Sequence, residues 1–120
     1  MSRYLIINTS VDLVRIASEK IVYISSDGNY VHLIDANGES RMLSHQLGEI
    51  ETLISKQLKD EGVAFLRIGK SLIVNRNYIN YINISKQKLI LSDVATFSHT
   101  LSASKEALRQ LKELIEKEGR

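Results

Sequence analysis

The tripeptide Gly69-Lys70-Ser71 has the residue types that bind phosphate in nucleotide-binding loops. Such a loop needs another glycine five positions earlier, so that consecutive backbone N–H groups surround the phosphates, and a helix must follow it. This chain has Ala64 at the earlier position, and Leu72-Ile73-Val74 follows the tripeptide with the β-branched composition of a strand. The tripeptide therefore predicts a basic turn between two strands and not a nucleotide site.

Two other patterns could do chemistry, and neither is complete. Ser102 and Lys105 have the spacing of an acyl-enzyme motif, but the Ser-Asp-Asn and Lys-Thr-Gly elements that this chemistry also needs are missing from the sequence. His32, His45 and His99 are far apart in sequence, and no carboxylate stands at ligand spacing from them. For His32 and His99, neutral packing is favoured over contact with a partner. We therefore expect no enzyme, no metal site and no cofactor.

Basic residues are concentrated in the middle of the chain. Between Glu61 and Asp93 there is no acidic residue, although the formal net charge of the whole chain is only +2. Such segregation makes one part of a nearly neutral molecule electropositive, as expected of a surface that meets phosphates. The alternative is an ordinary solvated basic face. The basic residues of this interval are Arg67, Lys70, Arg76, Lys86 and Lys88.

Length and composition limit the class of protein. A chain of 120 residues, 43% of them hydrophobic, suits one domain spanning residues 1–120 and can bury a modest core. The absence of cysteine excludes disulfides and thiolate metal sites. No apolar run is long enough for a membrane span or a signal peptide. We therefore expect a cytoplasmic protein that does not enter the membrane.

The elements around these residues are mainly short strands separated by turn signals. Asn37-Gly38 supplies the positive-φ residues of a tight turn, so the segments before and after it should pair antiparallel. We expect another hairpin across Ser92-Asp93. The expected strands are residues 4–7, 12–16, 20–25, 29–34, 39–43, 64–68, 72–75, 79–84, 87–91 and 94–98.

One helix is predicted in the central part of the chain, within residues 44–62. Its apolar residues recur at steps of three and four positions, which is the period of a helix with one buried face. Ser44 can cap its beginning and Gly62 can end it. The apolar stripe consists of Leu47, Ile50, Ile54 and Leu58.

A second helix is predicted near the C-terminus, within residues 102–119. Ser102 or Ser104 can cap its beginning, and Glu106 stands near the positive end of its dipole. The apolar stripe consists of Leu108, Leu111, Leu114 and Ile115. No internal repeat and no linker divides the chain.

The order of these segments resembles the LytTR-type DNA-binding domain of bacterial transcription regulators. The resemblance covers nearly the whole chain, and its most specific part combines Phe65, Arg67-Ile68, Lys70-Ser71, Ile73-Val74-Asn75 and Tyr78-Ile79. It implies a mainly β fold, an elongated stack of antiparallel sheets with one central and one C-terminal helix. It also implies loops that enter successive major grooves of double-stranded DNA, without a recognition helix.

The resemblance assigns DNA contacts to three loops. The first contains Asn29 and Tyr30, where the amide of Asn29 suits adenine or serves only the turn, and where Tyr30 either contacts a base or begins a strand with a half-buried ring. The second contains Gly69, Lys70 and Ser71. Family members often have a polar residue at the first of these positions and Arg or Asn at the second, so one base contact is missing and the lysine offers only a point charge.

The third loop is the beginning of the last helix, where Ser104-Lys105 stands in place of the Ser-Arg of many family members. Its lysine would reach a phosphate or a guanine edge. Arg76 and Lys88 are the further basic residues expected at the DNA surface, with Lys88 on a strand pair that faces only the DNA backbone. Ser71 would donate to a phosphate, whereas Asn75 is expected to fix the turn after its strand.

Partners and context follow from the same resemblance. LytTR-type regulators usually bind paired direct repeats, which implies a homodimer on DNA. They usually carry an N-terminal receiver domain, whereas this chain begins shortly before its first expected strand. It is then a standalone regulator or the output half of a longer response regulator. The alternative function is a protein-interaction module that binds another regulator without reading DNA, which Gly69 and the small charge excess favour.

Overall fold

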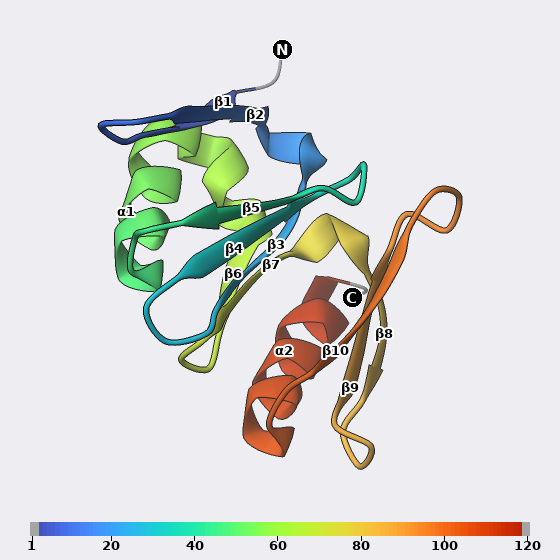
Figure 1. Cartoon of the computed structure of the whole chain (residues 1–120). Helices are drawn as coiled ribbons and strands as arrows, with labels where there is room; N and C mark the ends of the chain where they lie inside the picture. Colours follow the sequence, from blue (N-terminus) through green and yellow to red (C-terminus); the bar gives the residue numbers. More distant parts are fainter. Residues whose placement is uncertain (1–2, 119–120) are drawn as a thin grey trace.

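The computed structural model describes residues 3–118 and consists of three antiparallel sheets and two helices (Figure 1). The central sheet has the strand order β5-β4-β3-β7-β6, a second sheet has the order β10-β9-β8, and β1 and β2 form a hairpin of their own. The principal extents are 43 × 34 × 26 Å. This arrangement confirms the mainly β, stacked fold expected from the sequence. The strands are β1 (Tyr4–Asn8), β2 (Leu13–Ala17), β3 (Ile21–Ser26), β4 (Val31–Asp35), β5 (Ser40–Leu43), β6 (Phe65–Ile68), β7 (Leu72–Asn75), β8 (Ile79–Asn83), β9 (Lys88–Ser92) and β10 (Ser98–Ser102).

The central sheet separates two hydrophobic cores. Alternate residues of a strand point to opposite faces, so Ile73 of β7 enters one core while Leu72 and Val74 enter the other. The first core is closed by α1 (Leu47–Leu58) and the β1–β2 hairpin. The second is closed by the β8–β10 sheet and α2 (Lys105–Glu118). Strands buried on both faces read as continuous apolar runs, and all four residues of β7 are buried.

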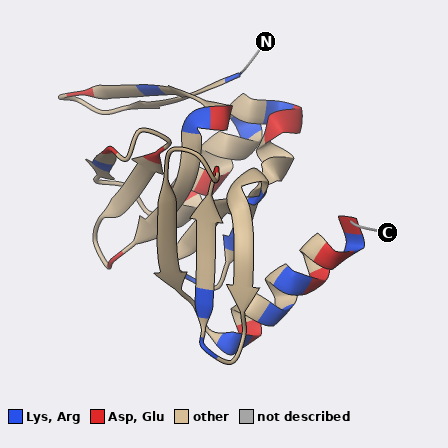
Figure 2. Ribbon diagram, turned by 90° about the vertical axis from the view of Figure 1, so that its right-hand side faces the viewer, with Lys and Arg blue, Asp and Glu red and all other residues tan. Residues whose placement is uncertain are grey.

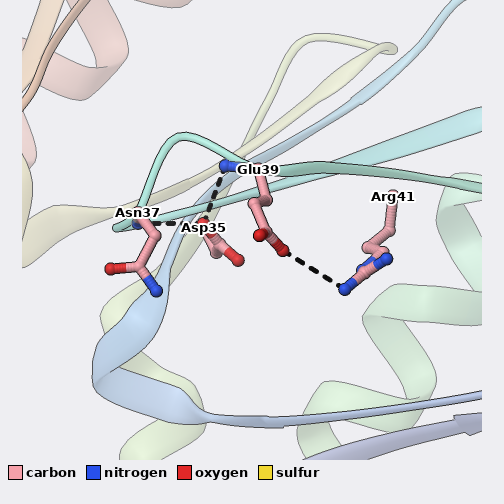
Figure 3. Close-up of polar contacts among 4 residues, drawn as sticks. All are labelled: Asp35, Asn37, Glu39 and Arg41. Atoms are coloured by element: carbon pink, nitrogen blue, oxygen red, sulfur yellow. Dashed lines mark hydrogen bonds and ion pairs between the residues drawn. The ribbon is translucent and has the colours of Figure 1, made fainter.

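The turn between β4 and β5 is held by the side chain of Asp35 (Figure 3). Its Oδ1 accepts hydrogen bonds from the backbone N–H groups of Asn37 and Glu39, each 2.9 Å long. Gly38 has φ +84°, and among the described residues of this turn it alone has a positive φ. The predicted antiparallel pairing is confirmed, but the expectation that Asn37 shares the positive φ is wrong, because the Asp35 carboxylate satisfies the turn instead.

Helix α1 begins later and ends earlier than its sequence signals suggested. It starts after Gln46 and not after Ser44, because the Glu49 carboxylate, three residues on, accepts the Gln46 backbone N–H at 2.9 Å. It ends at Leu58, and the 3₁₀ segment η2 (Lys59–Ala64) follows. Gly62 therefore does not end α1, and it packs closely against the helix, since a Cβ there would lie 3.2 Å from the carbonyl oxygen of Ile54.

The hairpin between β9 and β10 is displaced from its predicted position. The expected strand 94–98 is instead β10, at Ser98–Ser102, and the turn is longer than Ser92-Asp93. The Asp93 carboxylate accepts backbone N–H groups of Ala95, Thr96 and Phe97 at 2.7–3.0 Å, and also the Thr96 hydroxyl. These bonds hold residues 94–97 in the turn, so the strand begins only after Phe97.

Helix α2 begins where one of the two predicted caps stands. The Oγ of Ser104 accepts the backbone N–H of Ala107 at 3.1 Å, so Ser104 is the cap. Ser102 is the last residue of β10 and therefore not the cap. Ala107, Leu108 and Leu111 are buried against the second core, whereas Leu114 is half exposed. Gly119, at the end of the predicted segment, lies outside the described residues.

Candidate nucleic-acid interface

The three loops named by sequence analysis lie along one side of the molecule. In Figure 1 the β3–β4 loop, the β6–β7 turn and the beginning of α2 follow one another along the lower left side. The backbone N–H of Ser26, at the end of β3, donates to the carbonyl of Ser71 at 2.8 Å, which ties the first loop to the second. Three loops that are far apart in sequence thus lie next to one another on the same side of the molecule.

The β3–β4 loop exposes both of its candidate residues. Asn29 and Tyr30 are exposed, and Tyr30 precedes β4, with 46% of its surface accessible. β4 begins one residue after Tyr30, because the backbone N–H of Asp27 bonds to the Tyr30 carbonyl at 3.1 Å and closes the loop, whereas the expected half burial of the ring agrees with its exposed fraction. Its ring is therefore available to a partner.

The same loop contains a hydrogen bond between two side chains that sequence reasoning missed. His32 Nε2 lies 2.9 Å from Asp27 Oδ2, which joins the first strand residues of β4 to the beginning of the loop. In the sequence the two residues are five positions apart with Gly28 between them. The positive φ of Gly28, +100°, lets the chain reverse so that the two side chains meet. His32 is thus held by a carboxylate and not only by packing.

The β6–β7 turn is short, and the side chain of Arg67 holds it in place. Gly69 has φ +61°, a conformation that other residues rarely adopt. Arg67 donates to the Lys70 carbonyl at 3.1 Å and forms an ion pair of 3.0 Å with Glu51 of α1. Lys70 and Ser71 are exposed. The turn therefore presents an ammonium and a hydroxyl on a backbone that is fixed from the α1 side.

A hollow connects this turn with the beginning of α2. Its volume is about 370 Å³, and it extends from Gly69-Lys70-Ser71 to Ser102 and Ser104. Tyr23 lines it as well, and burial raises the pKa of this phenol, so it stays neutral at physiological pH. The second and third candidate loops thus flank one depression, and Lys105 follows directly on the α2 side.

The basic residues predicted to form one electropositive surface divide into two groups. Arg67 pairs with Glu51, and Arg76 pairs with Glu118 near the end of α2. Lys70, Lys86 and Lys88 are exposed, and within residues 3–118 no carboxylate forms an ion pair with them. The acidic partners are far away in sequence, which is why the charge count along the chain overstated the free positive charge.

Asn75 and His99, two further polar residues considered in the sequence, contact other parts of the fold. Asn75 is buried, donates to the Ile21 carbonyl at 2.9 Å and accepts the Asn77 N–H at 3.0 Å. It fixes the turn after β7, as expected. His99 packs against Tyr23 and Phe97 with ring centroids 5.5 Å apart in both pairs.

Metal binding and membrane insertion find no support in the part of the chain that the structure describes. Residues 3–118 contain no group of three or more His, Asp or Glu side chains that could hold a metal ion. Neither α1 nor α2, the α-helices described, has the length and apolar character needed to cross a bilayer.

Comparison with known proteins identifies the family and the fold of the chain. The family model of the LytTr DNA-binding domain matches residues 12–116. A solved structure, the LytTr DNA-binding domain of a Bacillus cereus protein described as a methyl-accepting/DNA response regulator, has 19% sequence identity and a TM-score of 0.63. That alignment covers 96% of this chain and 98% of the other. None of the curated protein sequences compared with the chain matches it. Because the family model spans most of the sequence, the chain belongs to the LytTR family of DNA-binding domains, which act in transcription regulation.

Proposed function

We propose that this chain, as one domain, binds double-stranded DNA sequence-specifically by inserting the three loops into the major groove. The observation that carries the proposal is their common position on one side of the molecule (Figure 1), tied by the 2.8 Å bond between Ser26 and Ser71. Exposed polar tips on a rigid sheet are suited to base edges, because the major groove presents a distinct pattern of donors and acceptors for each base pair. Catalysis plays no part in this function.

Within this interface the loops have different tasks. Tyr30 and Asn29 read base edges in the first loop, and Lys105 reads a base edge at the beginning of α2. Lys70 and Ser71 bind phosphate near Gly69, where the absence of a side chain lets the backbone approach the DNA. Ser104 caps α2 through its oxygen, and its hydroxyl proton can still be donated to a phosphate.

Other basic residues anchor the domain or hold it together. Lys88, exposed at the beginning of β9, contacts the DNA backbone without reading sequence. Arg76 was expected at the DNA surface, but its guanidinium is paired with Glu118 and mostly covered, with 28% of the side chain exposed. We assign Arg76 to holding the last turn of α2 against the β7–β8 connection.

The experiment that tests this function is selection of duplexes from a random library, followed by electrophoretic mobility shift. We expect enrichment of a defined sequence and tighter binding to it than to random duplex. Specific binding of this kind typically exceeds non-specific binding by a factor of about 10³ or more. Equal affinity for all duplexes would leave non-specific DNA binding and remove the base-reading roles.

A second candidate function is binding of a regulatory protein without reading DNA. The observation that favours it is the β1–β2 hairpin, whose outer face and connecting turn keep apolar side chains partly or largely exposed within residues 3–118. On the strands these side chains lie on the face opposite the buried Leu5 and Ile7, and Val11 lies in the turn. A protein that bound no duplex even at low salt would favour this function. The exposed residues are Tyr4, Ile6, Val11 and Leu13.

A further inference from the structure

A second hollow lies between the β8–β9 hairpin and one face of α2. Its volume is about 460 Å³, and its lining contains three basic side chains and no acidic one. Figure 2 shows the blue segments of the hairpin beside the blue segments at the beginning of α2. We call this hollow the α2 groove. It is lined by Ile82, Asn83, Ile84, Ser85, Lys105, Arg109 and Lys112.

The basic residues of the α2 groove stand on one helical face. Lys105, Arg109 and Lys112 are separated by four and three residues, so they lie one above another along the helix. The span from the first to the last is about 10 Å at 1.5 Å per residue. A row of cations of this length can contact neighbouring phosphates of one DNA strand.

These charges are available to a partner. All three side chains are exposed. The one ion pair on this row within the described residues joins Arg109 to Glu106 at 3.9 Å, and both side chains are more than half exposed, at 56% and 73%. Such a pair contributes little in water and is readily exchanged for a phosphate. Arg67 and Arg76, by contrast, are both less than one-third exposed in their pairs.

The opposite wall of the groove consists of two isoleucines and of Asn83 and Ser85, whose side chains bond to each other. The Oδ1 of Asn83 accepts the Ser85 hydroxyl and the Lys86 backbone N–H, each at 3.0 Å, and its Nδ2 donates to the Tyr81 hydroxyl at 3.0 Å. The turn that carries Lys86 is therefore held in place beside the groove, and Ser85 stays exposed. This wall keeps its shape beside the three cations of α2, which supply the positive charge that a phosphate requires.

We propose that the α2 groove binds the phosphate backbone of DNA, continuing from Lys105 and extending the contact along α2 beyond the three loops. The proposal rests on the proposed DNA-binding function and adds Arg109, Lys112 and the Asn83–Ser85 wall to it. Lys105 belongs to both surfaces, which places the backbone in the groove when the loops occupy the major groove. Arg109 and Lys112 contribute affinity for every sequence and no discrimination between sequences, whereas Lys105 joins the groove to the base-reading loops.

The test measures binding to a random-sequence duplex over a series of salt concentrations. The groove variant is Arg109→Gln with Lys112→Gln, and the matched control is Lys20→Gln with Lys56→Gln, which removes the same charge from exposed positions on η1 (Ser18–Lys20) and α1. Each lost phosphate contact should make the slope of log affinity against log salt shallower by about 0.9. We expect a change of about 1.8 for the groove variant and none for the control.

The outcomes separate this proposal from the function on which it rests. Wild-type protein that binds with a clear salt slope, together with a groove variant of unchanged slope, overturns the groove alone. Equal loss of slope in groove variant and control also overturns it, because only net charge would then matter. Wild-type protein that binds no duplex overturns both proposals. Melting curves of all variants should match that of the wild type, because the substituted residues are on the surface. Matching curves would show that the variants are folded.

Discussion

Gly69 shows how a single residue determines the geometry of the β6–β7 turn. Its φ of +61° lies in the left-handed region, where a side chain is strained even though a Cβ would meet nothing within 4 Å. Gly69→Ala should therefore lower the free energy of unfolding by about 1–2 kcal/mol through backbone strain alone. Urea unfolding measures this change.

Gly48 supplies the matched control for that substitution. It stands in the first turn of α1, a Cβ there would also meet nothing within 4 Å, and its φ is not positive. Gly48→Ala should raise stability by up to about 1 kcal/mol, because alanine favours a helix. Equal effects of the two substitutions would show that backbone conformation does not control the turn.

At the residue scale the sequence predicted some roles and missed others. The role of Asn75 in the turn after β7 was predictable, because the residues that it serves are close in sequence or on the neighbouring strand. The pairing of Arg67 with Glu51 and of Arg76 with Glu118 was not predictable, because α1 and α2 bring those carboxylates from distant parts of the chain. The DNA contacts themselves remain predictions.

Asp93 controls one structural element, the β9–β10 hairpin. Hydrogen bonds from the Thr96 side chain and from the backbone of Phe97 and Thr96 lower the pKa of its carboxyl from 3.8 to about 2. Asp93→Ala removes the acceptor of these bonds, so the melting temperature at neutral pH should fall. Asp60→Ala, at an exposed carboxylate, is the control and should leave the melting temperature unchanged.

The pH dependence of the Asp93 effect follows from the direction of its shift. A lowered pKa in the folded state means that ionised Asp93 stabilises the fold above its ordinary pKa, and that this stabilisation is lost as the pH falls through about 2. The difference in melting temperature between wild type and Asp93→Ala should therefore be constant near neutral pH and shrink in acid. A difference that stayed constant down to the lowest pH would contradict the hydrogen-bonded carboxylate.

Element boundaries were predictable where the local pattern was the only signal. β7 was predicted with its observed bounds, because an apolar run between a glycine turn and Asn75 leaves no other choice. The strand predicted at 94–98 was wrong by four residues, since the Asp93 carboxylate extends the turn as far as Phe97. Ser44 was predicted to cap α1, but the cap residue is Gln46. Glu49, three residues after Gln46, accepts the hydrogen bond from the Gln46 backbone N–H.

The whole molecule places the three loops proposed to read DNA on one side of a stack of sheets (Figure 1), and that arrangement has a consequence for site spacing. If two copies bind direct repeats on one face of DNA, adding about five base pairs, half of a ~10.5 base-pair turn, should abolish cooperative binding. Adding a full turn should restore it. Cooperative binding that tolerates the half-turn insertion would exclude two copies on one face, and sedimentation of the complex gives the number of copies.

In the proposed function, exposed loops read DNA sequence while other basic residues only anchor the domain. The most direct measurement compares Lys105→Ala, Tyr30→Ala and Lys88→Ala for binding to the selected site and to random duplex. Loss of a base contact should cost about 1–3 kcal/mol on the selected site and less on random duplex. Loss of Lys88 should weaken both equally and make the salt slope shallower by about one contact. Well-folded Lys105→Ala and Tyr30→Ala proteins that weakened both duplexes by the same factor would contradict the account.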